Sequence, residues 1–341
     1  MQVWNRPPEP NASPLPTVVT RTTRSSQAGG WQAARVISGE QSRTAQYVAL
    51  FRALESRRPA AGRLFADPLA EAFLDRPLRA AASAAGVPVV GHVLSWLLDR
   101  RIPGPRPSAV ARTRFIDDAL RSAIADGTQQ VVILGAGYDS RAYRMPELRH
   151  LKVFEVDHPD TQVTKRHVLE RELGTLPGHV AFVPIDFDRD PLADALAAAG
   201  LQPGVSTFTI WEGVVSYLTP QAVDTTVRWT SSIAGPNSQL VMTYVHRGLI
   251  DGTQQFRHAD AWVRAVQQAG EPFVFGFEPA DLARYLTDRG WDLLDDLSTP
   301  QALAQYGLSA ARVPSFYRIA HATLTTVPTP APPSPADARR Q

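Results

Sequence analysis

The sequence predicts an α/β protein with one doubly wound, mostly parallel sheet of about seven strands and a block of helices in front of it. From about residue 128, short β-branched runs alternate with stretches of helical periodicity, which is typical of a parallel sheet covered on both faces. Before that point the apolar residues recur every three or four positions. The 341 residues, 44% of them hydrophobic, are enough for one large domain or two smaller ones.

The block in front contains two clear helical segments. The first, RTAQYVALFRALESRR, has a one-sided apolar stripe of Tyr47, Leu50, Phe51 and Leu54. The second, SAVARTRFIDDALRSAIADG, ends at Gly127, a residue suited to the position after a helix. These segments predict an N-terminal helical cap over residues 35–128.

The remaining elements follow in order along the chain. The first five expected strands are QVVILGAG, LKVFEVD, VAFVPID, VSTFTIWEG and SQLVMTYVH, with helices at 159–173, 190–199 and 220–233. A helix PADLARYLTDRG then precedes the strands WDLLDDLS and PSFYRIAHATL, the last of them antiparallel. We therefore expect a core over 129–324 with an insertion at 247–277, and disordered, proline-rich tails at 1–34 and 325–341.

Charge and composition limit which classes of binding partner and which kinds of chemistry we expect. The 35 basic and 33 acidic residues nearly cancel, so we expect neither nucleic acid nor membrane as a partner. No run approaches the ~20 apolar residues of a membrane span, and the first forty residues lack a secretory core, so we expect a cytoplasmic protein. The absence of cysteine excludes disulfides, thiolate metal sites and a cysteine nucleophile.

A glycine turn follows the first strand, in VVILGAGYDSRAYRM. Gly135 and Gly137 stand where a dinucleotide-binding loop has its first two glycines, but the third glycine position holds Ser140. This departure argues against a pyrophosphate and favours a nucleoside that carries no phosphate. A plain tight turn between strand and helix is the alternative.

Acidic residues end the next three strands, where ligands of such sheets bind. Asp157 lies 20 residues after Gly137, the offset of a ribose-binding acid, although it could instead cap the following helix. Asp186 could accept the exocyclic amine of adenine beside Phe187, or belong to a solvated turn. Glu212 meets either a ligand cation or an arginine, because a carboxylate after an apolar strand needs a cation. Glu155, on the same strand face as Asp157, is a ligand or the partner of an arginine.

Five segments in order, RTRFIDDAL, VVILGAGYDSRAYR, FEVDHPDTQ, IDFD and EGVVSYL, resemble the leucine carboxyl methyltransferase family, in its bacterial S-adenosylmethionine-dependent branch. The resemblance covers about residues 38–320. It implies a Rossmann-like fold of the class I methyltransferases, with the insertion as a lid, and S-adenosylmethionine as cofactor with S-adenosylhomocysteine as product.

For the methionyl end of the cofactor, the resemblance implies that Arg112 pairs with the carboxylate. The backbone at Gly135 faces the methionyl part, and Glu212 lies near the ammonium or the sulfonium. Arg114, two residues on, and Arg141, after the turn, are the alternatives to Arg112.

For the nucleoside end, the resemblance implies that Asp157 holds the ribose, and that Asp186 and Phe187 hold the adenine. Relatives commonly have leucine where Phe187 stands, which keeps an apolar wall. A basic residue of the first helical segment also contacts the ligand in relatives, and Arg43 is the candidate.

The proposed chemistry is attack of an acceptor oxygen on the methyl group, catalysed mainly by proximity and alignment. An acceptor carboxylate, with a pKa near ~4, is already ionised and needs no base. A hydroxyl needs one, and His246, after VMTYV, is the candidate base unless it is an ordinary hydrogen-bonded histidine. Metal catalysis is not expected, because His158 and Asp160 have no third ligand at a suitable spacing.

The front helices and the insertion 247–277 should form the acceptor pocket. The candidate substrate-binding residues are Tyr217, Tyr244, Phe256 and Trp262. Aromatic residues of the insertion, which also include Phe273, Phe275 and Phe277, would suit a lid over a small aromatic or polyketide-type acceptor, or simply pack the insertion.

Two other functions fit parts of the sequence. A nicotinamide-dependent oxidoreductase would explain the glycine turn and Asp157 but not Ser140. A non-catalytic module would bind the cofactor without turnover. The identity of the acceptor and the oligomeric state stay open.

Overall fold

The structure is a computed structural model that describes residues 43–185 and 191–325. The predicted tails, apart from Thr325, lie outside the described residues. None of the helices in these two ranges is long and apolar enough to cross a membrane.

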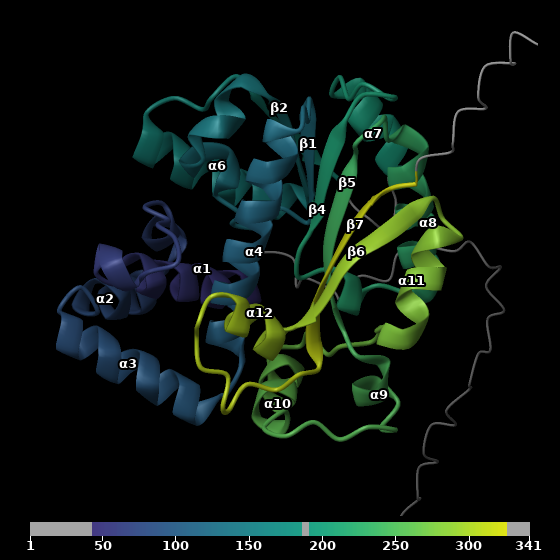
Figure 1. Cartoon of the computed structure of the whole chain (residues 1–341). Helices are drawn as coiled ribbons and strands as arrows, with labels where there is room; N and C mark the ends of the chain where they lie inside the picture. The colour runs from purple at the N-terminus through teal and green to yellow at the C-terminus, as the bar shows by residue number, and fades with distance from the viewer. Residues whose placement is uncertain (1–42, 186–190, 326–341) are drawn as a thin grey trace, which may run out of the picture.

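One mixed sheet forms the centre of the molecule, as predicted. Within the described residues it has seven strands in the order β3-β2-β1-β4-β5-β7-β6 (Figure 1). They are β1 (Gln130–Leu134), β2 (Lys152–Asp157), β3 (Val180–Pro184), β4 (Thr207–Trp211), β5 (Gln239–Val245), β6 (Trp291–Ser298) and β7 (Tyr317–Leu324). The first five are parallel, and β7 is antiparallel to both neighbours.

Helices cover both faces of this sheet. One face carries α4 (Pro105–Ala125), α5 (Arg141–Arg144), α6 (Pro159–Leu173) and α12 (Thr299–Gln305), and the other carries α7 (Leu192–Ala198), α8 (Pro220–Ile233) and α11 (Pro279–Thr287) (Figure 1). Strand β1 is therefore buried along its whole length. Val131 and Ile133 pack towards α4, whereas Val132 and Leu134 pack towards α8 and α11. Because both faces of the strand are covered, side chains on both faces are apolar, which explains the continuous apolar run in the sequence.

The helical cap comprises α1 (Arg43–Ser56), α2 (Arg76–Ala84) and α3 (Pro88–Arg101), which lead into α4. Leu50 and Leu54 of α1 are buried, in agreement with the predicted stripe. Tyr47 is the exception, because its side chain is half exposed and stacks on Phe51. Gly127 follows Asp126, the C-cap of α4, and has a positive φ, as predicted for the residue after a helix C-cap.

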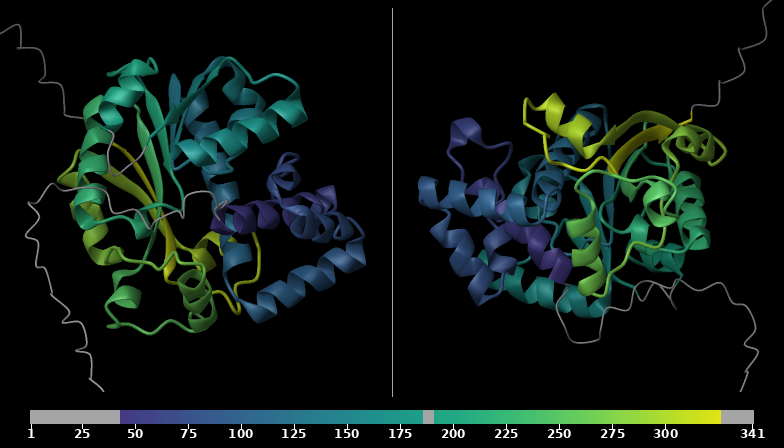
Figure 2. Two further views of the ribbon diagram at one scale, coloured as in Figure 1. Left: turned by 180° about the vertical axis from the view of Figure 1, so that it is seen from behind. Right: turned by 90° about the horizontal axis from the view of Figure 1, so that it is seen from below.

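The insertion 247–277 contains α9 (Arg247–Ile250) and α10 (Asp260–Gln268) and lies where β5 ends, at the lower end of the sheet in Figure 1. Trp262 and Val266 of α10 pack with Val245 of β5 and with Phe316 and Tyr317 at the start of β7. Seen from below in Figure 2, the purple and blue cap helices lie beside the green insertion. Strand order reverses between β1 and β4, so the edge to inspect for a ligand is the carboxyl end of these strands.

Candidate functional site

The glycine turn leaves β1 at the point where strand order reverses. Gly135 and Gly137 both have φ in the left-handed region, at +67° and +40°. A Cβ atom at position 135 would overlap with Cγ2 of Val214, in the segment after β4. Glycine at 135 is therefore required both by the backbone angle and by the close approach of a neighbouring segment.

The third glycine position of a dinucleotide loop holds a buried side chain. The Ser140 hydroxyl donates a hydrogen bond of 2.6 Å to Asp67, which lies between α1 and α2. A hydrogen bond from Ser140, the residue that replaces the third glycine, thus links the turn to the cap.

Asp157, the last residue of β2, is bonded directly to the glycine turn. Its carboxylate accepts the backbone N–H of Gly137 and, at 2.6 Å, that of His158. Desolvation raises the pKa of Asp157, and these two N–H donors oppose the rise. The side chain that caps α6 is His158 and not Asp157. Because each carboxylate oxygen can accept two hydrogen bonds, Asp157 keeps acceptor capacity for a ligand.

Glu212, just after β4, joins two arginines from different elements. One carboxylate oxygen accepts from Nε of Arg112 at 2.6 Å, and the other accepts from Nη1 of Arg141 at 2.9 Å. Burial would raise the pKa of Glu212, but the charges of Arg141 and Arg112 outweigh it and lower that pKa. The sequence left open whether Glu212 meets a ligand cation or an arginine, and in the described residues it pairs with two arginines. The Glu212 side chain remains 14% exposed, so a ligand ammonium can still approach it.

The three candidate arginines have different partners. Arg112 is buried, and within the described residues its hydrogen bonds use only Nε. Arg114 turns away, to Asp118 at 2.8 Å and to the carbonyl oxygen of Leu64 at 2.6 Å. The structure therefore brings Arg112 and Arg141, but not Arg114, to the acid after β4.

A buried ionic network extends from this point, and sequence reasoning missed it. Asp117 of α4 accepts hydrogen bonds of 2.8 Å from both Arg141 and Arg144. Asp67 accepts from Arg52 of α1 at 2.8 Å. An available signal was Asp117 itself, an acid next to Ile116 in the stretch that packs on the sheet. A buried acid in such a helix needs a cationic partner.

The insertion reaches Arg112 through Tyr317, another residue that sequence reasoning missed. Trp262 of α10 stacks on the Tyr317 ring with 5.3 Å between centroids, and the Arg112 guanidinium lies 5.3 Å from the centre of the same ring. Tyr217 packs on Phe273 of the insertion, with centroids 5.7 Å apart. Burial, with the nearby Tyr317 next in effect, raises the pKa of Tyr217, so its hydroxyl stays protonated at neutral pH.

Two other candidates are engaged elsewhere. Tyr244 lies on the face of the sheet that α11 covers. There its hydroxyl donates a hydrogen bond of 2.8 Å to Asp296 and accepts one of 3.0 Å from Arg318. The structure does not bring Tyr244 to the Arg112 side. His246 accepts the N–H of Gly248 at 3.0 Å through Nδ1 and thereby caps α9.

The remaining nitrogen of His246, Nε2, lies 3.6 Å from Glu278, and Phe256 packs on the ring with centroids 5.1 Å apart. His246 is thus a hydrogen-bonded histidine, as its alternative interpretation predicts. Because Nδ1 accepts the Gly248 N–H, the neutral ring carries its proton on Nε2, so in this arrangement Nε2 is a hydrogen-bond donor.

Glu155 has a lysine as its partner, where the sequence suggested an arginine. Its carboxylate lies 2.8 Å from the ammonium of Lys165 and accepts a hydrogen bond of 3.0 Å from the Tyr143 hydroxyl. Desolvation raises the pKa of Glu155 to about 7, against the lowering effect of Lys165. Glu155 therefore has a structural partner on α6.

Asp186 and Phe187 lie outside the described residues, and Arg43 is the first residue of α1. In the part of the chain that the structure describes, no group of three or more His, Asp or Glu side chains could hold a metal ion.

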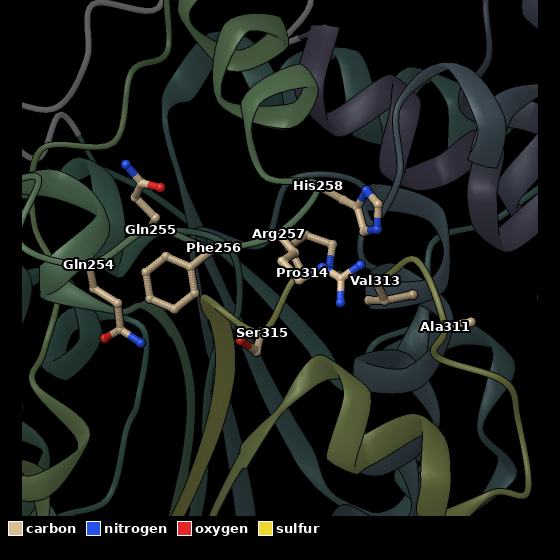
Figure 3. A pocket seen from close by; sticks show the side chains of 9 residues that line it. All are labelled: Gln254, Gln255, Phe256, Arg257, His258, Ala311, Val313, Pro314 and Ser315. Atoms are coloured by element: carbon tan, nitrogen blue, oxygen red, sulfur yellow. The ribbon is translucent and has the colours of Figure 1, made fainter.

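A cavity of about 290 Å³ lies between the insertion and the segment before β7 (Figure 3). It is lined by Gln254, Gln255, Phe256, Arg257, His258, Ala311, Val313, Pro314 and Ser315. Phe256 is the one expected aromatic residue among them, and Trp262 is buried and does not line the cavity. Arg112, Asp157 and Glu212 do not line it.

Comparison with known proteins places the chain in a family. The sequence profile of the leucine carboxyl methyltransferases matches residues 45–231. A Streptomyces coelicolor protein, provisionally named as an S-adenosyl-L-methionine-dependent methyltransferase, is 34% identical over 277 residues, which are 80% of this chain and 89% of the relative. A Rhodococcus jostii protein with the same provisional description is 36% identical over 282 residues, with the same two coverages.

Among solved structures, a protein from Thermobifida fusca, provisionally described as a methyltransferase, has the same fold. Its TM-score is 0.50 at 15% identity, over 82% of this chain and 94% of that one. Because the profile matches more than half of the chain and both relatives are more than 30% identical to it, this chain belongs to the leucine carboxyl methyltransferase family.

Proposed function

We propose that the protein is an S-adenosylmethionine-dependent O-methyltransferase that acts on a carboxylate or hydroxyl group of a small-molecule acceptor. Family membership and the names of the relatives support the methyltransferase activity and the cofactor. The oxygen acceptor, which we expect to be an aromatic or polyketide-type metabolite, is suggested by the family resemblance and by the aromatic residues of the insertion.

The observation that carries the proposal is the Arg112–Glu212 pair beside the glycine turn. The cofactor has an amino-acid end with one carboxylate and one ammonium, and the pair offers one cation and one anion side by side, 2.6 Å apart. The Arg112 guanidinium would bind the carboxylate, and Glu212 would bind the ammonium. Arg141 keeps Glu212 ionised for this role.

The nucleoside end fits the same edge of the sheet. Asp157 would accept hydrogen bonds from the ribose hydroxyls, and the Gly135 turn allows the backbone to approach the ligand closely. We keep Asp186 and Phe187 as candidates for the adenine and Arg43 for a further contact. The buried Ser140 leaves no glycine for a pyrophosphate, which argues against the oxidoreductase alternative.

Bound S-adenosylmethionine supplies an activated methyl group, so this chain needs mainly to align the acceptor. A carboxylate acceptor needs no base. For a hydroxyl acceptor, His246 stays the candidate base, and it would have to release the Gly248 N–H from Nδ1 to take up the proton, with Glu278 beside Nε2 to stabilise the charged ring. Tyr217, Phe256 and Trp262 stay candidates for acceptor contacts.

The test is transfer of label from cofactor to product. The protein is incubated with methyl-labelled S-adenosylmethionine and a bacterial cell extract, and labelled products are identified by mass spectrometry. We expect a labelled small molecule, whose loss of label in alkali would identify a methyl ester. Binding of the cofactor without transfer to any acceptor would instead support the non-catalytic alternative.

A further inference from the structure

We propose that Tyr317 is a positioning residue that holds both members of the Arg112–Glu212 pair and links them to the insertion. This inference rests on the proposed function, because the pair is the proposed site of the cofactor's amino-acid end. Tyr317 is the first residue of β7 and is buried.

The ring of Tyr317 supports Arg112. The guanidinium carbon lies 5.3 Å from the ring centre, within the ~6 Å over which an aromatic face attracts a cation. The Glu212 carboxylate accepts a hydrogen bond of 2.6 Å from Nε of the same guanidinium. Glu212, just after β4, and Tyr317 of β7 therefore fix the guanidinium. Within the described residues this leaves Nη1 and Nη2 for a carboxylate ligand.

The hydroxyl of Tyr317 supports the other member of the pair. It lies 3.0 Å from Oγ1 of Thr243, and that oxygen accepts the backbone N–H of Gly213 at 2.8 Å. Gly213 follows Glu212 directly in the chain. One side chain thus contacts Arg112 with its ring and supports the backbone next to Glu212 with its hydroxyl.

The insertion packs on the same ring. Trp262 stacks on Tyr317 with an interplanar angle of 20°, and it also contacts the neighbouring Phe316 with centroids 4.9 Å apart. Any displacement of α10 therefore reaches the ring that holds Arg112. Tyr317 connects the proposed acceptor side of the molecule with the cofactor side.

The test measures S-adenosylmethionine affinity by calorimetry for wild type, Tyr317→Phe and Tyr317→Leu. We expect Tyr317→Leu, which removes the ring, to weaken binding about tenfold, equivalent to ~1.4 kcal/mol. Tyr317→Phe keeps the ring and should weaken binding only about two- to threefold. The matched control is Tyr285→Leu, which removes a ring that holds Arg289, 3.5 Å from its centre, on the α11 side. It should leave the affinity unchanged.

A double-variant cycle separates positioning from general damage. If Tyr317 acts through Arg112, Tyr317→Leu should cost much less in the Arg112→Ala background than in wild type. Equal losses in both backgrounds, or unchanged affinity in folded Tyr317→Leu, would overturn the inference. Should Tyr317→Leu not fold, Tyr317→Phe decides: a two- to threefold loss of affinity supports the role of the hydroxyl, and an affinity equal to wild type would overturn the inference. Wild type that fails to bind S-adenosylmethionine would refute the proposed function itself, a separate result.

Discussion

The guanidinium of Arg112 meets two groups in the structure, the Glu212 carboxylate and the Tyr317 ring. We predict that Arg112→Ala weakens S-adenosylmethionine binding by ~1.5–3 kcal/mol, the range for losing a hydrogen bond to a charged group. Arg114→Ala is the matched control, because Arg114 is on the same helix but pairs with Asp118. Calorimetry should find its affinity equal to wild type. Equal losses in both variants would contradict the role of Arg112.

The raised pKa of Glu155 should make the free energy of unfolding depend on pH. Its pKa of about 7 in the folded protein is above the ordinary 4.5, so the folded state binds the proton more tightly than the unfolded state. The resulting stabilisation is complete below pH 4.5 and is lost as the pH rises through 7. We predict that the free energy of unfolding, from urea titrations at pH 5 to 8, falls with pH in wild type by on the order of 1–3 kcal/mol more than in Glu155→Gln. Parallel pH profiles would contradict this prediction.

Single residues also mark how far the sequence could predict the site. The offset between Gly137 and Asp157 predicted a ribose-binding acid, which stays a prediction. The structure adds a hydrogen bond between these two residues that the offset did not predict. The partner of Glu212 was left open, because Arg112 is 100 positions away in the chain. Tyr317 was missed for the same reason. Its position near Arg112 follows from the register of the antiparallel last strand, which pairs Tyr317 with Val245 of β5 and which local patterns do not specify.

At the scale of elements, the glycine turn between β1 and α5 offers a clean comparison. Gly135 and Gly174 both have positive φ, at +67° and +77°, but among the described residues no atom lies within 4 Å of where a Cβ atom of residue 174 would be. Gly174→Ala should therefore cost only the ~1–2 kcal/mol of the backbone angle. Gly135→Ala adds an overlap with Val214, so we predict a further ~1–3 kcal/mol and weakened cofactor binding. Urea unfolding measures both, and equal losses would show that the close approach has no energetic weight.

Most elements were predictable, because their periodicity is local. Residues 159–173 and 220–233 form α6 and α8 as predicted, since each helix has Pro at its start and the capping side chains of His158 and Thr219 precede them. The insertion was less predictable. Its aromatic residues fitted either a lid over a pocket or simple packing, and Trp262 and Phe273 pack on Phe316, which agrees with the packing alternative.

At the scale of the whole molecule, the ionic network joins the cap to the sheet. We propose that the cap and the core, over the described residues 43–185 and 191–324, unfold as one unit. Asp117→Asn should cost ~3–5 kcal/mol, because it leaves Arg141 and Arg144 buried with a missing counter-charge. The neighbouring Asp118→Asn should cost at most ~1 kcal/mol, because Asp118 is 39% exposed. Urea unfolding followed by circular dichroism measures both. Two separate transitions in wild type would contradict a single unit.

Binding of the cofactor is the central claim, and it can be measured directly by calorimetric titration of wild type and Asp157→Ala with S-adenosylmethionine and, separately, with NAD. We predict that wild type binds S-adenosylmethionine and not NAD, and that folded Asp157→Ala binds it more weakly by ~1.5–3 kcal/mol. Binding of NAD alone, or an unchanged affinity for S-adenosylmethionine in folded Asp157→Ala, would contradict the assignment of this edge of the sheet.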